Sequence, residues 1–93
     1  MFWKLIQYEK DFLKQVDTLG DLSRWRLQYF ITNIANEEKP LSKWNHKTCP
    51  THKNFHLIGL NDDGLGNKKL EILFQIDDDT KVLRFCMVKE LDN

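Results

Sequence analysis

LEILFQIDDDTKVLRFCMVKE, residues 70–90, is the segment that decides the fold of this chain. Apolar and polar residues alternate from Lys69 to Asp77 and again from Lys81 to Glu90, with Asp78-Asp79 between the two runs. Alternation of this kind is typical of half-buried strands, and adjacent aspartates favour a turn. The segment therefore predicts an antiparallel hairpin.

The apolar residues of the hairpin restrict how its two strands can pair. Those of each strand fall on one face, and they meet only if the numbers of paired residues sum to an odd value. We therefore expect Phe74 to pair with Phe85 or, one step over, with Leu83. Either register turns a second face away from the core, where a site would lie; it carries Glu71, Leu73, Gln75, Arg84 and Cys86.

The N-terminal part of the chain predicts a strand followed by a helical hairpin. Residues 2–8 alternate and are rich in aromatic side chains, which favours a strand. From Glu9 apolar residues recur at helical spacing, and Gly20 can end this helix in a left-handed cap. Asp21 can cap a second helix reaching Asn36. The apolar stripes contain Phe12, Leu13, Val16 and Leu19, then Trp25, Leu27, Phe30, Ile31 and Ile34.

A third strand of the sheet is predicted over Phe55 to Leu60, and residues 61–67 form the turn after it. Residues 37–54 contain both prolines and no periodicity, so we expect a long surface connection there. The whole pattern predicts one α+β domain, residues 1–93, with a mainly antiparallel sheet of about four strands and both helices on one face. Its core should contain Leu5 or Ile6, Phe12, Val16, Phe30, Ile34, Ile72, Phe74, Phe85 and Met87.

Charge is distributed unevenly along the chain. Lysine plus arginine equals aspartate plus glutamate at 14 each, yet residues 39–56 hold four lysines, all three histidines and no carboxylate. This segment suggests an anionic partner, although a neutral protein would offer nucleic acid only a local patch. No apolar run spans a bilayer and the N-terminus lacks a signal-peptide pattern, so we expect a cytoplasmic protein.

The histidines of the basic segment suggest two kinds of chemistry. His46, Cys49, His52 and His56 are ligands that zinc accepts, but their spacing matches no standard zinc motif. We predict neither a tightly bound metal nor another cofactor. A histidine beside lysines can instead transfer protons in RNA cleavage, while a cation stabilises the phosphate.

Four residues are the candidates for this catalysis. His52 or His56, with Glu71 and Arg84, would meet, beside Lys53, if the long connection folded over the open sheet face. The alternative is that Glu71 and Arg84 form a cross-strand ion pair near solvated histidines.

Trp44 lies between Lys43 and Lys47. Its ring could stack on a base while these lysines and Lys53 contact phosphates. It could equally pin the connection to the core, since tryptophan is rarely left exposed.

Several segments together resemble the RelE/ParE superfamily of bacterial toxins. They are residues 8–14 (YEKDFLK), 55–57 (FHL), 70–77 (LEILFQID) and 82–85 (VLRF), and they are nearest to the HigB-like branch. The resemblance implies a small messenger-RNA-cleaving protein that acts on the ribosome. Some members use glutamate, arginine and histidine together, which is compatible with Glu71, Arg84 and a histidine of the long connection. The sequence departs from the HigB-like pattern at Glu71, where arginine is expected, and after the last strand, where paired basic residues reduce to Lys89 before Glu90.

The expected function is therefore that of a RelE-like toxin of a toxin–antitoxin system. It would be a metal-independent ribonuclease with RNA or the ribosome and a cognate antitoxin as partners, and its RNA contacts would come from Lys43, Trp44, Lys47, Lys53 and Lys89. The alternative is a small immunity or antitoxin-like protein that binds and neutralises a toxin by electrostatic complementarity, without chemistry.

Overall fold

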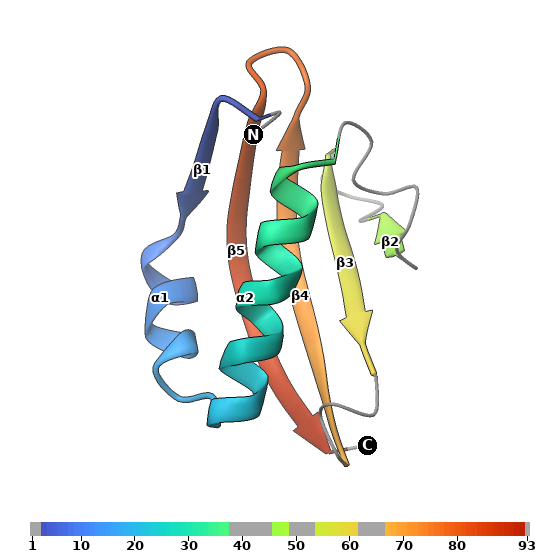
Figure 1. Ribbon diagram of the computed structural model, residues 1–93. Coiled ribbons are helices and arrows are strands. Elements are labelled where there is room, and N and C mark those ends of the chain that lie inside the picture. The colour runs from blue at the N-terminus through green and yellow to red at the C-terminus, as the bar shows by residue number, and fades with distance from the viewer. Residues whose placement is uncertain (1–2, 38–45, 49–53, 62–66, 93) are drawn as a thin grey trace.

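The computed structural model describes residues 3–37, 46–48, 54–61 and 67–92. Along the chain the elements are β1 (Leu5–Tyr8), α1 (Lys10–Val16), α2 (Asp21–Ala35), β2 (His46–Thr48), β3 (Phe55–Leu60), β4 (Lys68–Asp77) and β5 (Val82–Asp92). The strands form one sheet in the order β1-β5-β4-β3-β2, and both helices cover one of its faces (Figure 1). β1 pairs with β5 in parallel, and the remaining pairs are antiparallel. The predicted α+β class is confirmed.

The sheet contains one strand that the sequence did not indicate. β2 lies within residues 37–54, where we expected only a connection, and pairs His46 with Ile58 and Thr48 with His56 of β3. A strand of three residues is too short to show periodicity in the sequence. The expectation of an irregular segment is therefore wrong over these positions.

Of the two predicted hairpin registers, the structure has at its centre the one in which Phe74 pairs with Phe85. Their ring centroids lie 5.7 Å apart, Phe12 lies 5.7 Å from Phe85, and Phe30 meets Phe74 edge-on at 6.4 Å. All four rings are buried, and aromatic contacts of this geometry add to the free energy gained by burying their area. This cluster joins both helices to the middle of the sheet.

A β-bulge interrupts the same hairpin one step further on. Leu73 pairs with Met87, so Cys86 is the extra residue on β5. An extra residue reverses the alternation, and Val88 turns into the core at 2% exposure while Met87 is 37% exposed. Met87 was predicted in the core, and that prediction is wrong because the sequence pattern does not reveal the bulge.

The helices bury fewer of the predicted apolar residues than expected. Leu27, Phe30 and Ile34 of α2 are buried, whereas Trp25 points outward and is 65% exposed, so its expected place in the stripe is wrong. Of the other expected core residues, Ile6 and Val16 pack against the core from partly buried positions, and Leu5 is exposed.

The joint between the helices also differs from its prediction. Gly20 has φ −68° and ψ 166°, which is extended rather than left-handed, and it is Gly20 rather than Asp21 that occupies the N-cap of α2. The amide of Gly20 donates to Glu90 Oε2 at 3.4 Å, and Gln15 Oε1 accepts from the Val88 amide at 2.9 Å. These contacts hold α1 and the joint against the part of β5 that lies beyond β1.

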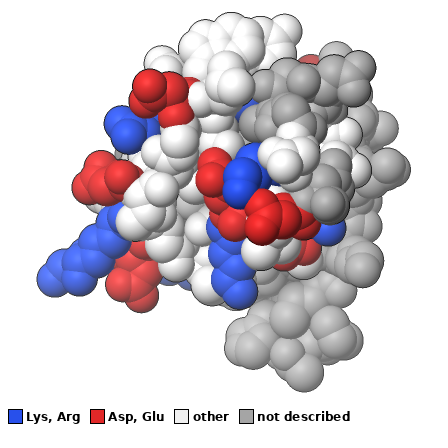
Figure 2. All heavy atoms as spheres, turned by 90° about the horizontal axis from the view of Figure 1, so that it is seen from below, with Lys and Arg blue, Asp and Glu red and all other residues white. Residues whose placement is uncertain are grey.

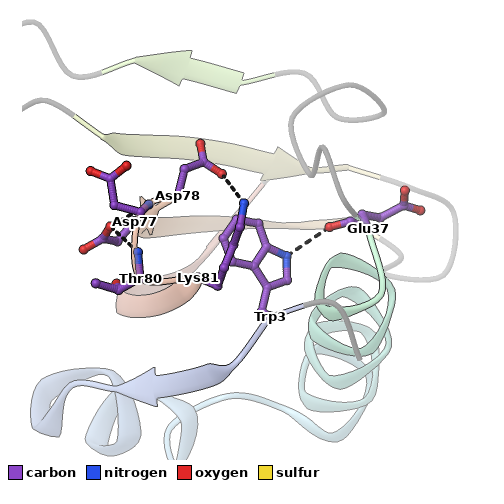
Figure 3. A network of polar contacts seen from close by, with 7 residues as sticks. Trp3, Glu37, Asp77, Asp78, Thr80 and Lys81 are labelled. Carbon is purple, nitrogen blue, oxygen red and sulfur yellow. Dashed lines mark hydrogen bonds and ion pairs between the residues drawn. The ribbon is translucent and has the colours of Figure 1, made fainter.

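Trp3 lies between the end of α2 and the β4–β5 turn (Figure 3). Trp3 is buried, and its indole N–H donates to the Glu37 carbonyl oxygen at 3.0 Å. The ammonium of Lys81 lies 5.7 Å from the Trp3 ring centroid and 3.7 Å from Asp78 Oδ1. Lys81 adopts φ 59°, a left-handed conformation that is uncommon for a lysine, at the point where the turn enters β5.

Candidate functional site

The open face of the sheet, which the helices leave uncovered, carries a polar row centred on Arg84. The register aligns Gln7 of β1, Arg84 of β5 and Gln75 of β4 side by side. Arg84 Nη2 donates to Gln75 Oε1, and Arg84 Nη1 lies 3.3 Å from Glu9 Oε1. Glu9 directly follows β1, and its amide donates to the Phe85 carbonyl oxygen at 2.9 Å, which places its side chain beside the arginine. We call Gln7, Glu9, Gln75 and Arg84 the arginine cluster.

A polar hollow of ≈ 350 Å³ opens beside the arginine cluster. The Arg84 side chain is 38% exposed, and its Nε is buried without a hydrogen-bond partner among the described residues. The guanidinium is therefore held in place while part of it stays accessible. The residues lining the hollow are Gln7, Gln75, Asp77, Thr80, Val82 and Arg84.

Glu71 lies on the same face but away from the arginine cluster. It pairs with Lys89 across the β4–β5 ladder and precedes Gln75 by four positions on β4, which is roughly 13 Å along a strand. The expected alternative of a cross-strand pair between Glu71 and Arg84 is therefore not found. The acid that contacts Arg84 is Glu9, which the sequence did not indicate.

His56 lies on the opposite face of the sheet. It pairs with Phe74 in the β3–β4 register, and the two ring centroids are 6.0 Å apart. The side chain is buried under the helices, so the structure does not bring His56 together with Glu71 or Arg84. The alternation of His56 with Ile58 and Leu60 in the sequence was a signal for this placement. His52 lies outside the described residues.

Most of the predicted RNA contacts fall outside what the structure describes. Lys43, Trp44 and Lys53 lie outside the described residues. Of Lys47 only the backbone is described, and it pairs with Leu57 in the β2–β3 ladder. Lys89 is exposed on the open face, opposite Glu71. Figure 2, which views the end of the molecule where β5 finishes, shows basic and acidic side chains interspersed, with no large area of one sign among the described residues.

Cys86, the bulge residue, lies near the arginine cluster and is partly buried. Burial raises the pKa of the Cys86 thiol, and the nearby Arg84 guanidinium opposes this by a smaller amount. A thiol of raised pKa is a weak nucleophile at neutral pH, so we assign Cys86 no part in catalysis. Within the described residues no three histidine, cysteine or acidic side chains gather as metal ligands. The helices that the structure describes are also too short and too polar to cross a membrane.

Comparison with solved structures identifies the fold. A chain of the intact E. coli RelBE toxin–antitoxin complex superposes with a TM-score of 0.69 at 15% identity, covering 96% of this chain and 98% of that one. The isolated E. coli RelE toxin gives 0.68 at 12% identity, covering 96% and 85%. A chain of the RelB–RelE antitoxin–toxin complex from Methanococcus jannaschii gives 0.67 at 22% identity, covering 89% and 87%. No protein-family model and no curated protein sequence matches the chain. The protein therefore has the RelE fold.

Proposed function

We propose that this protein is a RelE-like toxin of a toxin–antitoxin pair that cleaves messenger RNA in the cytoplasm. The observation that carries the proposal is the RelE fold along almost the whole chain, with a partly accessible arginine in a polar hollow of its open sheet face. Several similar structures are toxins bound to their antitoxins, which supports an antitoxin as the protein partner. The nearer relation to the HigB-like branch stays a prediction.

The chemistry requires three groups around the scissile phosphate. The 2′-hydroxyl must lose a proton as it attacks phosphorus, the leaving 5′-oxygen must gain one, and a cation must stabilise the charge on the phosphate. Arg84 would supply the cation, with Glu9 and Gln75 holding its guanidinium. Of the predicted groups for proton transfer, His52 remains the candidate, because Glu71 lies roughly 13 Å from Gln75 along β4 and therefore away from the phosphate that Arg84 would hold. His56 is not included, because its ring packs in the core.

The proposed RNA path crosses the open face. Lys89 would contact phosphate there, and Lys43, Trp44, Lys47 and Lys53 would hold the RNA from the basic segment. Metal has no part in this scheme, because the guanidinium already supplies the positive charge.

Expressing the chain alone tests the proposal. Wild type should arrest growth and cleave translated messages, and Arg84→Ala should lower the cleavage rate by roughly a hundredfold or more. A half-exposed ion pair stabilises the fold by under about 1 kcal/mol, so this variant should stay folded. Lys14→Ala, which removes an exposed cation from α1, is the matched control and should cleave like wild type. Undiminished cleavage by folded Arg84→Ala would reject the site.

The pairing of charges on the open face favours a second candidate, a non-enzymatic protein that binds and neutralises a toxin. Arg84 contacts Glu9, and Lys89 lies opposite Glu71, so these two cations face carboxylates. A wild type that is harmless alone and rescues cells from a co-expressed toxin would establish this function instead. Recognition would then rest on complementary charge.

A further inference from the structure

The outer side of α2 exposes an aromatic ridge. Leu22, Trp25 and Tyr29 follow one another at helical spacing, and Trp25 and Tyr29 are 65% and 55% exposed. Their rings already stack, with centroids 5.9 Å apart and an interplanar angle of 18°. Arg26 holds its guanidinium 5.6 Å from the Tyr29 ring centroid. Rings that are ordered before binding lose little conformational entropy when a partner covers them.

An apolar groove of ≈ 400 Å³ lies on the neighbouring side of α2, between this helix and α1. Exposed Leu13 and half-exposed Tyr8 contribute to its walls, so the groove is open to a partner. Arg24 also lines it, anchored to the Leu19 carbonyl oxygen by Nε and Nη2 at 3.4 and 3.3 Å. The full lining is Tyr8, Phe12, Leu13, Val16, Arg24, Leu27, Gln28, Ile31 and Thr32.

The ridge and the groove are contiguous. A shallow hollow of ≈ 240 Å³ is lined by Trp25 and Tyr29 of the ridge together with Gln28 and Thr32, and the last two also line the groove. The line from Gln28 to Thr32 therefore separates the two features. Both also lie at the same height along α2, since the groove takes its α2 residues from positions 24–32 and the ridge occupies positions 22–29.

This placement makes the surface complementary to itself. A two-fold axis parallel to α2 leaves each residue at the same position along the helix direction. It also places the ridge side of one copy opposite the groove side of the other. The ridge of each copy therefore meets the groove of its partner, which gives two equivalent contacts. An axis perpendicular to α2 would oppose ridge to ridge. In the first arrangement the Trp25 ring of each copy would also approach the anchored Arg24 guanidinium of its partner, a favourable cation–π pairing.

The exposed apolar side chains supply more than half of the area of a standard interface. Tyr8, Leu13, Leu22, Trp25 and Tyr29 each expose between 43% and 65% of their surface. For side chains of about 200 Å² this amounts to roughly 500 Å² per copy, against about 800 Å² per partner in a standard interface. Arg24, Gln28 and Thr32 border the same surface and extend it. We propose that two copies of this chain form a dimer through parallel α2 helices, with each Trp25–Tyr29 ridge filling the groove of the other copy.

Sedimentation and light scattering of the purified full chain over a wide concentration range test the proposal. The mass should rise from 11.2 kDa toward twice that value. Trp25→Glu in the ridge and Leu13→Glu in the groove should each keep the protein monomeric without changing its circular dichroism, because both side chains are exposed. Asn67→Glu, an exposed turn residue outside the patch, adds the same charge and should dimerise like wild type.

A mixture of the two monomeric variants distinguishes this geometry from other dimers. The Leu13→Glu copy retains its ridge and the Trp25→Glu copy retains its groove, so the mixture should recover part of the dimer through one intact contact. A ridge-to-ridge dimer would gain nothing from mixing and would tolerate Leu13→Glu. A wild type that stays monomeric at every concentration overturns the proposal, even if Trp25→Glu weakens binding to another protein.

Discussion

The two faces of the sheet are built from adjacent residues but are organised by different rules. On the helix-covered face Ile72, Phe74 and Phe85 are completely buried, and any well-fitting apolar side chain could contribute there. On the open face Gln75 and Arg84 bond to each other, and Arg84 also contacts Glu9. Apolar burial on the covered face stabilises the fold. The polar contacts on the open face need a matched donor and acceptor at each position, so they fix the positions of particular side chains.

The two faces exchange character at the bulge. Before it, Phe85 points into the core and Arg84 outward; after it, Val88 points inward and Met87 outward. Without the extra residue, Met87 would be covered and Val88 would lie on the open face. The local position of one residue therefore decides which side chains of β5 are available to a partner.

The largest expected effect contrasts two neighbours in the middle of β4. Phe74→Ala should lower the free energy of unfolding by about 3–5 kcal/mol, because it leaves a cavity among Phe30, Phe85 and His56. Leu73→Ala removes a half-buried side chain from the open face and should cost less than half as much. Urea denaturation of both variants measures the difference. Equal losses of unfolding free energy in the two variants would show that the covered and open faces contribute equally to stability.

An intermediate effect tests the bulge itself. Val88→Ala should cost about 2 kcal/mol, since it removes two methyl groups from a fully covered side chain. Met87→Ala should cost under about 1 kcal/mol, because Met87 is already partly exposed. Thermal or urea unfolding would compare them, and the reverse order would mean that β5 continues in the register of Phe74 and Phe85 without a bulge.

The smallest expected effect is a dependence on pH at the turn between the two long strands. Asp77 accepts the amide of Thr80 at 3.2 Å and that of Asp79 at 3.1 Å, and the bonds to Thr80 in particular lower the Asp77 pKa (Figure 3). A lowered pKa stabilises the fold above the ordinary carboxyl value near 4, and this contribution is lost as the pH falls through the lowered value.

Asp77→Asn should therefore flatten the acid side of the curve of unfolding free energy against pH. Asp79→Asn removes the same charge from the same turn and should keep the wild-type slope. Chemical denaturation at a series of acidic pH values measures both curves. If the free energy of unfolding fell with pH equally in wild type and Asp77→Asn, the Asp77 carboxylate would not be the group that stabilises the fold above its lowered pKa.

Part of the candidate site could be predicted from the sequence. Alternation along residues 70–90 placed Gln75 and Arg84 on the open face, and the structure puts them there in contact. Glu9 could not be found in this way, because it reaches Arg84 only through the parallel pairing of β1 with β5. His56 lies in the core beside Phe74 and not with Arg84, as its alternation with Ile58 and Leu60 indicates.

The sequence by itself determined the α+β class, the helix-covered face and the two possible partners of Phe74 in the hairpin, Phe85 and Leu83. These features follow from repeats of two and 3.6 residues, which are local properties of the chain. Only the tertiary structure decided the bulge at Cys86, the burial of Trp3 and the bond from the Val88 amide to Gln15, whose partners are 73 positions apart. Their physical reason is packing between distant segments, which no local pattern encodes.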